Sequence, residues 1–354
     1  MPTSFDPVKA IPATAGLLAA AYWAFPIYRD PFYRPFFDII ASTSLWIGLL
    51  GVLYVYWLDP LMADPQDGAW HLGCVVTGRW NSVDAAKVRE HLLGWTIKGY
   101  FLPIMIGWLG QNLSWLARPG LWAGAHGFLD YVEIGKTCIF SLDLGFGALG
   151  YVLTMRIIDG QIRSPDPTLL GWTVALICYP PAYDLIFNSY LNWMHDYQWQ
   201  TWLADRPTLL IVWGSAIVIL ELLFALATVS FGYRFSNLTH RGILTHGLYR
   251  LTKHPAYVTK CLSFWMIAIP FIPVQSWEQA VRQSLALAGI NLIYWLRART
   301  EERHLSRDPI YVEYALWMEE NGIFRWLGRI LPVLRYRPPA TSWTGLRRSR
   351  SSPG

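Results

Sequence analysis

Residues 240–260 read HRGILTHGLYRLTKHPAYVTK, and they are followed by two apolar runs, by RARTEERHL at residues 297–305 and by YVEY at residues 311–314. The two apolar runs are short and are separated by a small polar turn, Gln275-Ser276-Trp277-Glu278. Such a pattern is typical of a helical hairpin that returns the chain to the side from which it started. The sequence therefore predicts that the polar residues near 240–257 lie beside the charged residues near 297–305.

The composition of the whole chain is that of an integral membrane protein. Of the 354 residues, 53% are hydrophobic and only 15% are charged, whereas soluble domains carry about 25% charged residues. The 20 Trp and 19 Tyr residues suit helix ends that are anchored at the level of the lipid head groups. These values exclude an ordinary soluble enzyme, and we expect membrane lipids as partners and no nucleic acid.

Eight apolar stretches are long enough to cross, or nearly cross, a bilayer with a hydrocarbon core of about 30 Å. They cover residues 11–28, 37–58, 99–117, 136–157, 168–187, 208–231, 256–273 and 282–297. Pro26 and Pro180-Pro181 fall inside the first and fifth stretches, where they are expected to kink or interrupt the helix. We predict an all-α, polytopic transmembrane bundle of about eight helices, followed by a cytoplasmic helix over residues 300–327 with a turn at Asn321-Gly322.

The basic residues indicate the orientation. Most of the 29 Lys and Arg residues fall on one side of the membrane when both termini are placed in the cytoplasm, as the positive-inside rule requires. The N-terminus lacks the basic start and cleavage site of a secretory signal, so the first apolar run is expected to be retained. The Trp-rich and Arg-biased composition and the absence of an obvious retrieval signal favour a bacterial inner membrane.

The chain divides into three regions. Residues 1–207 form an N-terminal transmembrane region with no recognisable role, residues 208–332 contain the polar clusters, and residues 333–354 read as a flexible basic tail near anionic lipid. Within the first region, residues 59–98 are expected to form a long cytoplasmic loop, with an amphipathic surface helix over residues 83–97. The four cysteines are scattered without a C-x-x-C pair, so neither a disulfide framework nor a metal site is expected.

The loop before the seventh stretch has features of a binding site. Gly242 and Gly247 permit tight turns, and His254-Pro255 stands where a helix is expected to begin. The free N–H groups and positive dipole end of such a helix suit a carboxylate, and Tyr249 adds a flat ring and a hydroxyl. Taken alone, these features fit interfacial anchoring better than a binding site.

The end of the hairpin contributes charges. Arg297 and Glu301 are four residues apart and share one helix face, with Glu302 next to them. By itself this pair fits a solvated helix end. Because the hairpin returns these residues to the side of His254 and Tyr257, the combination favours a site for a zwitterion that carries an amino and a carboxylate group.

The order GLYRLTKHPAY at residues 247–257, an apolar hairpin, RARTEERHL and YVEY resembles the isoprenylcysteine carboxyl methyltransferase family and its phospholipid-methyltransferase relatives. The resemblance covers roughly residues 230–327 and rests on the H-P-x-Y and R-x-x-x-E-E-x-x-L motifs at this separation. It implies a membrane enzyme that takes S-adenosylmethionine from the cytosol and methylates a lipidic or hydrophobic acceptor on a carboxylate, hydroxyl or amine.

Carried onto this chain, the resemblance implies a set of cofactor-binding residues: Arg241, Ile243, Leu244, Gly247, Tyr249, His254, Pro255, Ala256, Tyr257, Glu301 and Glu302. Arg297 matches the position that meets the polar head of the acceptor, and no catalytic base is assigned. The chain departs from the family pattern at Lys253, at Lys260 and at Pro309. His240 stands one residue further from Tyr249 than the histidine of the family, which leaves its role open.

Three acidic residues lie within apolar stretches, where a carboxylate is costly and often functional. Glu221 either faces the pocket or bonds to a neighbouring helix, and Asp143 and Asp184 pose the same choice. Two other protein classes compete with the methyltransferase: a membrane reductase of the sterol or steroid type that uses NADPH, and a transporter. The H-P-A-Y motif followed by the Glu-Glu helix favours the methyltransferase over the reductase. The gathering of polar residues at one face counts against a transport path.

Overall fold

Helices account for nearly all of the regular structure in the computed structural model, which describes residues 11–194 and 197–339. The α-helices are α1 (Ile11–Ala24), α2 (Arg34–Leu58), α3 (Gly68–Val76), α4 (Ala85–Leu116), α5 (Phe128–Val152), α6 (Leu169–Leu176), α7 (Trp199–Trp202), α8 (Pro207–Phe231), α9 (Pro255–Ala268), α10 (Trp277–Leu305), α11 (Pro309–Asn321) and α12 (Arg325–Ile330). Two strands of two residues each, β1 (Ser164–Pro165) and β2 (Thr239–His240), pair antiparallel. The predicted all-α class is confirmed.

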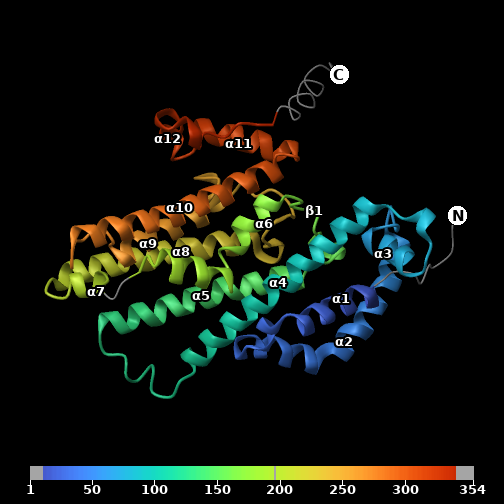
Figure 1. The fold of residues 1–354 in the computed structure, drawn as a ribbon, viewed down its shortest axis with the longest axis horizontal. Coiled ribbons are helices and arrows are strands. Elements are labelled where there is room, and N and C mark those ends of the chain that lie inside the picture. The colour runs from blue at the N-terminus through green and yellow to red at the C-terminus, as the bar shows by residue number, and fades with distance from the viewer. Residues whose placement is uncertain (1–10, 195–196, 340–354) are drawn as a thin grey trace.

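The long helices lie side by side along the longest axis of the molecule (Figure 1). Helix α5 packs against α4 and α8, and α8 packs against α9. The stacking follows the chain order, from the blue α1 and α2 at the bottom of the view to the orange α10 near the top. The end at which α5 finishes and α9 begins also holds β1 and the last turns of α10, and α11 and α12 lie above α10 in this view.

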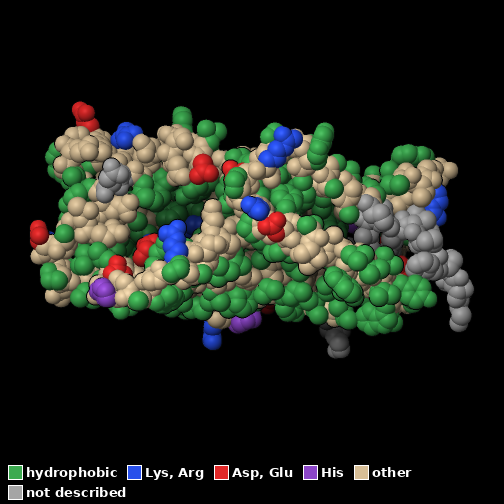
Figure 2. Space-filling model, turned by 90° about the horizontal axis from the view of Figure 1, so that it is seen from below, with side chains coloured by type: hydrophobic (Ala, Val, Ile, Leu, Met, Phe, Trp, Pro, Cys, Tyr) green, Lys and Arg blue, Asp and Glu red, His purple; other side chains and the backbone are tan. Residues whose placement is uncertain are grey.

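Three helical segments are long and apolar enough to cross a membrane: Pro31–Leu61, Ala85–Leu116 and Pro207–Arg234. The side chains of α2 are exposed although they are apolar, and Leu45 and Trp46 remain 68% and 63% exposed. Figure 2 shows a face of the molecule that is mainly hydrophobic, with few charged side chains. An apolar surface of this extent is typical of contact with lipid, which agrees with the predicted membrane protein.

Each of the eight predicted apolar stretches coincides with helical structure. The first helix stops at Ala24, just before a 3-10 turn that begins at Pro26. The fifth stretch is broken: α6 ends at Leu176, and a π-helical segment, Asp184–Leu191, follows the Pro180-Pro181 pair. Both interruptions lie where proline removes the backbone donor that a continuous helix needs.

The prediction of a long loop over residues 59–98 is wrong. This region contains α3, and residues 85–98 form the first part of α4, which continues to Leu116 without a break. The predicted surface helix is instead covered by α1, because Tyr22 Oη donates to the carbonyl of Gly99 at 2.8 Å and Ile97 is fully buried. Because of this packing, residues 85–98, which look amphipathic, form one continuous helix with the apolar stretch that follows them.

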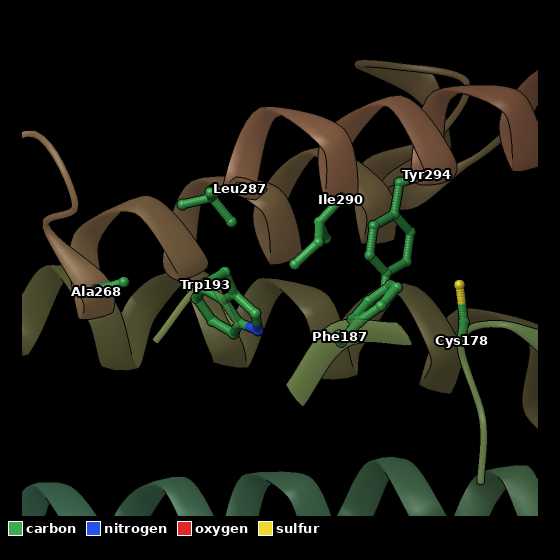
Figure 3. Close-up of a cluster of buried hydrophobic side chains, with 7 residues drawn as sticks. All are labelled: Cys178, Phe187, Trp193, Ala268, Leu287, Ile290 and Tyr294. Atoms are coloured by element: carbon green, nitrogen blue, oxygen red, sulfur yellow. The ribbon is translucent and has the colours of Figure 1, made fainter. Parts of the chain in front are cut away.

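A buried cluster fixes the α9–α10 hairpin to the interrupted segment before it (Figure 3). Its members are Cys178, Phe187, Trp193, Ala268, Leu287, Ile290 and Tyr294. Leu287, Ile290 and Tyr294 lie at spacings of three and four residues on one face of α10. This contact positions the last turns of α10 relative to the rest of the bundle.

Only the start of the predicted tail falls within the described residues. There Tyr336 is buried, and its hydroxyl lies 2.7 Å from Ser306 Oγ at the end of α10. The remainder of the predicted tail, residues 340–354, lies outside the described residues.

Candidate functional site

The hairpin brings the polar loop and the charged end of α10 together. Tyr257, in the first turn of α9, donates a hydrogen bond from its hydroxyl to Glu301 Oε2 at 2.8 Å. His254, just before α9, lies with Nε2 3.3 Å from Glu302 Oε1. Residues more than forty positions apart in the chain thus form one polar cluster at the end of the hairpin.

Glu302 is the charged centre of this cluster. Its carboxylate lies 2.8 Å from Lys253 Nζ and 2.6 Å from Arg299 Nη1, in addition to the contact with His254. Burial alone would raise the pKa of the Glu302 carboxyl, but the hydrogen bond from His254 and the charge of Lys253 outweigh it and hold this pKa at about 2. Glu302 is therefore ionised at neutral pH and orients the basic side chains around it.

Helix α9 opens toward the cluster with unsatisfied backbone donors. Pro255 occupies its first position, and the side chain of His254 makes no capping hydrogen bond. The N–H groups of Ala256 and Tyr257 then have no partner within the helix, and the positive end of the helix dipole adds to their attraction for an anion. The ring of His254 stacks on that of Tyr257 with 5.5 Å between centroids, so the two rings shape one wall.

A cavity of about 630 Å³ extends from this cluster into the bundle, which is within the usual size range of small-molecule sites. The residues predicted from the sequence that line it are Arg241, Tyr249, His254, Ala256, Tyr257, Arg297 and Glu301. On α5 the lining runs from Glu133 to Leu144, a length of roughly 16 Å along the helix. The cavity therefore links the polar end of the bundle to its apolar middle.

The other predicted cofactor residues lie behind this wall. Glu302 holds Lys253 and His254 in place from outside the cavity. Pro255 is buried and starts α9, and Gly247 forms a turn with a φ of +60° that favours glycine. Ile243 packs against a cluster that includes Tyr311, and Leu244 is half-buried next to it in the chain.

Arg241 has a structural task that the sequence did not indicate. The residue is 3% exposed, and its guanidinium donates to the carbonyl oxygens of Gly150 at 2.6 Å, of Phe235 at 2.9 Å and of Leu153 at 3.2 Å. It also bonds to the carbonyl of Gly160. Arg241 thus satisfies orphan carbonyls at the end of α5, and it reaches the cavity only at its edge.

Arg297 faces the cavity between two aromatic rings. Its guanidinium donates to Asn237 Oδ1 and lies 5.6 Å from the ring centroid of Tyr179 and 5.4 Å from that of Tyr257. Sequence reasoning missed Asn237 and Tyr179. Neither belongs to a motif, and only the tertiary fold brings them to Arg297, so the sequence carried no signal for them.

Several polar atoms of the cavity lining lack a hydrogen-bond partner among the described residues, and Thr239 Oγ1 and His304 Nδ1 are two of them. A buried polar group without a partner is costly, so these atoms are suited to bind a polar ligand. With the open amides of α9 and the carboxylate of Glu301, they provide both donors and acceptors. This donor set fits a nucleoside that bears an amino acid, such as S-adenosylmethionine.

The residues left open by the sequence divide into two groups. Glu221, Asp143 and Lys260 line the cavity. Asp184 instead accepts a hydrogen bond from Asn188 Nδ2 at 3.0 Å, and His240 lies 3.3 Å from Asp308. His195 and Asp196 lie outside the described residues.

Comparison of the chain with protein-family models, with curated proteins and with solved structures gives no match.

Proposed function

We propose that this protein is an integral membrane methyltransferase that uses S-adenosylmethionine and methylates a lipidic or hydrophobic acceptor at the cytoplasmic face. In this proposal the eight helical stretches cross a bacterial inner membrane, both termini are cytoplasmic, and residues 208–332 form the catalytic core. The end of the bundle that contains the start of α9 and the end of α10 then faces the cytosol.

The observation that supports the proposal most strongly is the pairing of Tyr257 with Glu301 in the wall of an elongated cavity. The polar end of this cavity suits a zwitterionic cofactor, and its other end reaches apolar side chains such as Phe140 and Leu144. A cofactor that binds at the polar end and an acceptor whose apolar part binds at the other end can therefore contact each other inside this cavity.

The mechanism requires positioning more than proton transfer. S-adenosylmethionine supplies, when bound, a methyl carbon that is already activated by its sulfonium. The N–H groups of Ala256 and Tyr257 would hold its carboxylate, Glu301 would bind its amino group or ribose, and the rings of Tyr257 and His254 would exclude water from the reacting atoms. Arg297 would orient the polar head of the acceptor.

The nature of the acceptor decides whether a base is needed. A carboxylate acceptor needs none, whereas a hydroxyl or an amine does. Three side chains near the hairpin, those of His246, His254 and Glu302, could accept a proton. Glu302 is held by three basic groups, and His246 is exposed outside the cavity. His254 alone lines the cavity, so we expect it to be the base if the acceptor is protic.

The transfer of a tritiated methyl group tests this function. Proteoliposomes that contain the protein, a membrane lipid extract and methyl-tritiated S-adenosylmethionine should move label into the organic phase. Glu301→Ala should abolish the transfer, whereas Glu313→Ala, an exposed position on α11, should not. Label that stays aqueous with extracts from several membranes, together with oxidation of NADPH by the same proteoliposomes, would favour the reductase instead.

A further inference from the structure

We infer that Lys260 and Arg297 together bind one anionic group, a carboxylate or a phosphate, at the head of an amphiphile whose tail occupies the apolar part of the cavity. The inference rests on the proposed function only in naming this amphiphile as the methyl acceptor. Lys260 is then the residue that sets specificity for an anionic head.

The two cations lie on neighbouring helices of the hairpin, and each is near a tyrosine of the other helix. Tyr257 and Lys260 share one face of α9, and Tyr294 and Arg297 share one face of α10. Each cation lies over the tyrosine of the other helix: Lys260 Nζ is 5.7 Å from the ring centroid of Tyr294, and Arg297 Cζ is 5.4 Å from that of Tyr257. Because the two tyrosine rings are 5.8 Å apart, both cations face the same region.

Neither cation has an acidic partner. Among the described residues, no carboxylate lies within salt-bridge distance of Lys260 or Arg297; Asp143, Glu221 and Glu301 are acids of the same cavity wall that lie outside this distance. Lys136, on the same wall, is different because it lies 3.4 Å from Glu133. Among the other basic residues of the cavity lining, Lys253 and Arg234 also have acidic partners, and Arg241 bonds to backbone carbonyls. For Lys260 and Arg297, the interactions found among the described residues are with aromatic rings and, for Arg297, with the amide of Asn237.

Rings compensate a buried cation only in part, and an unpaired charge inside a membrane bundle is costly and marks a functional site. Lys260 Nζ lies 5.0 Å from the ring of Phe224 and 5.9 Å from that of Phe264, and Tyr294 projects from α10 toward the bundle interior (Figure 3). An anion placed between Lys260 and Arg297 would supply the missing counter-charge. The apolar side chains further along the cavity, including Phe140 and Leu144, would then contact the tail.

Competition binding tests this site with four ligands that share one tail. The protein in nanodiscs of zwitterionic lipid is saturated with tritiated dodecanoate, which is then displaced by dodecanoate, dodecyl phosphate, dodecanol or dodecylamine. We expect the two anions to displace the label and the alcohol and amine to fail. The relative affinities of dodecanoate and dodecyl phosphate show whether the site prefers a carboxylate or a phosphate head group. Displacement by dodecylamine that matches dodecanoate would overturn the inference.

Variants assign the effect to Lys260. Lys260→Met should weaken dodecanoate binding by about tenfold to a hundredfold, as expected for the loss of a charged hydrogen bond, and Lys260→Arg should restore most of it. Lys136→Met removes a neutralised lysine of the same cavity and should leave the affinity unchanged. Unaltered binding by Lys260→Met, in a sample whose melting temperature is that of the wild type, would contradict the proposal.

S-adenosylhomocysteine binding, measured on the same samples, separates the two proposals. Loss of anion binding in Lys260→Met, without any binding of S-adenosylhomocysteine by the wild type, would support the anion site and contradict the methyltransferase. Binding of S-adenosylhomocysteine without a preference for anionic amphiphiles would support the methyltransferase and contradict the anion site.

Discussion

Glu302 shows how a single residue organises the end of the bundle at which α9 begins and α10 ends. It lies within 3.3 Å of His254 and closer still to Lys253 and Arg299. Removing one partner of a buried ion pair leaves the other charges uncompensated, which typically costs 3–5 kcal/mol. We therefore expect Glu302→Ala to lower the free energy of unfolding by about 3 kcal/mol, measured by thermal unfolding in detergent, with the exposed Glu313→Ala as control.

The contribution of Glu302 should depend on pH. Its pKa is about 2 in the folded protein against 4.5 for the free side chain, so the folded state favours the ionised form. The stability that it contributes is complete above the unfolded pKa and is lost as the pH falls toward the folded pKa. The difference in melting temperature between the wild type and Glu302→Gln should shrink from pH 7 to pH 3, and a difference that grows on acidification would contradict this account.

Among the elements, the end of α5 depends on a close backbone contact. A side chain at Gly150 would clash with the carbonyl oxygen of Phe235, whereas one at Gly145 would meet no atom within 4 Å. The same contact places the carbonyls of Gly150 and Phe235 where Arg241 bonds to both. Gly150→Ala should therefore lower the melting temperature.

The matched variant lies on the same helix. Gly145→Ala should leave the melting temperature unchanged or raise it slightly, because alanine has the higher helix propensity. Equal melting temperatures for the two alanine variants would show that the contact between α5 and Phe235 is not tight.

The sequence predicted helices best where the length of an apolar run and the positions of proline residues both indicate the same helix ends. The hairpin of α9 and α10 follows from two apolar runs and a polar turn, and the break after α6 follows from Pro180-Pro181. The 32-residue helix α4 was not predicted, because residues 85–98 carry enough charge to read as a surface helix. Only the packing of these residues against α1 shows that they continue into the apolar segment that follows them in the chain.

At the scale of the whole molecule, the orientation can be tested directly. In the proposed topology, Glu313 on α11 faces the cytoplasm and Trp122, between α4 and α5, faces the opposite side; both side chains are exposed. An impermeant maleimide should label Trp122→Cys in intact cells of a background without native cysteines. It should label Glu313→Cys only after permeabilisation, and the reverse pattern would invert the topology.

The sequence predicted the polar cluster at one end of the cavity, but it did not predict the cavity itself. Tyr257, His254 and Glu301 stand in motifs, and the hairpin explains why they meet. Asn237 and Tyr179 come from two other segments and carry no local pattern, so their approach to Arg297 follows only from the tertiary fold. Asp143 and Glu221 stand out in the sequence as carboxylates within apolar stretches, and both line the cavity.

Calorimetric titration of the purified protein with S-adenosylhomocysteine tests the central claim most directly. We expect saturable binding to the wild type and to Glu313→Ala, and binding that is at least about tenfold weaker for Glu301→Ala, since the cofactor loses a charged hydrogen-bond partner. NADPH should give no heat of binding. Binding of NADPH, with none of S-adenosylhomocysteine or S-adenosylmethionine, would contradict the methyltransferase and favour the reductase.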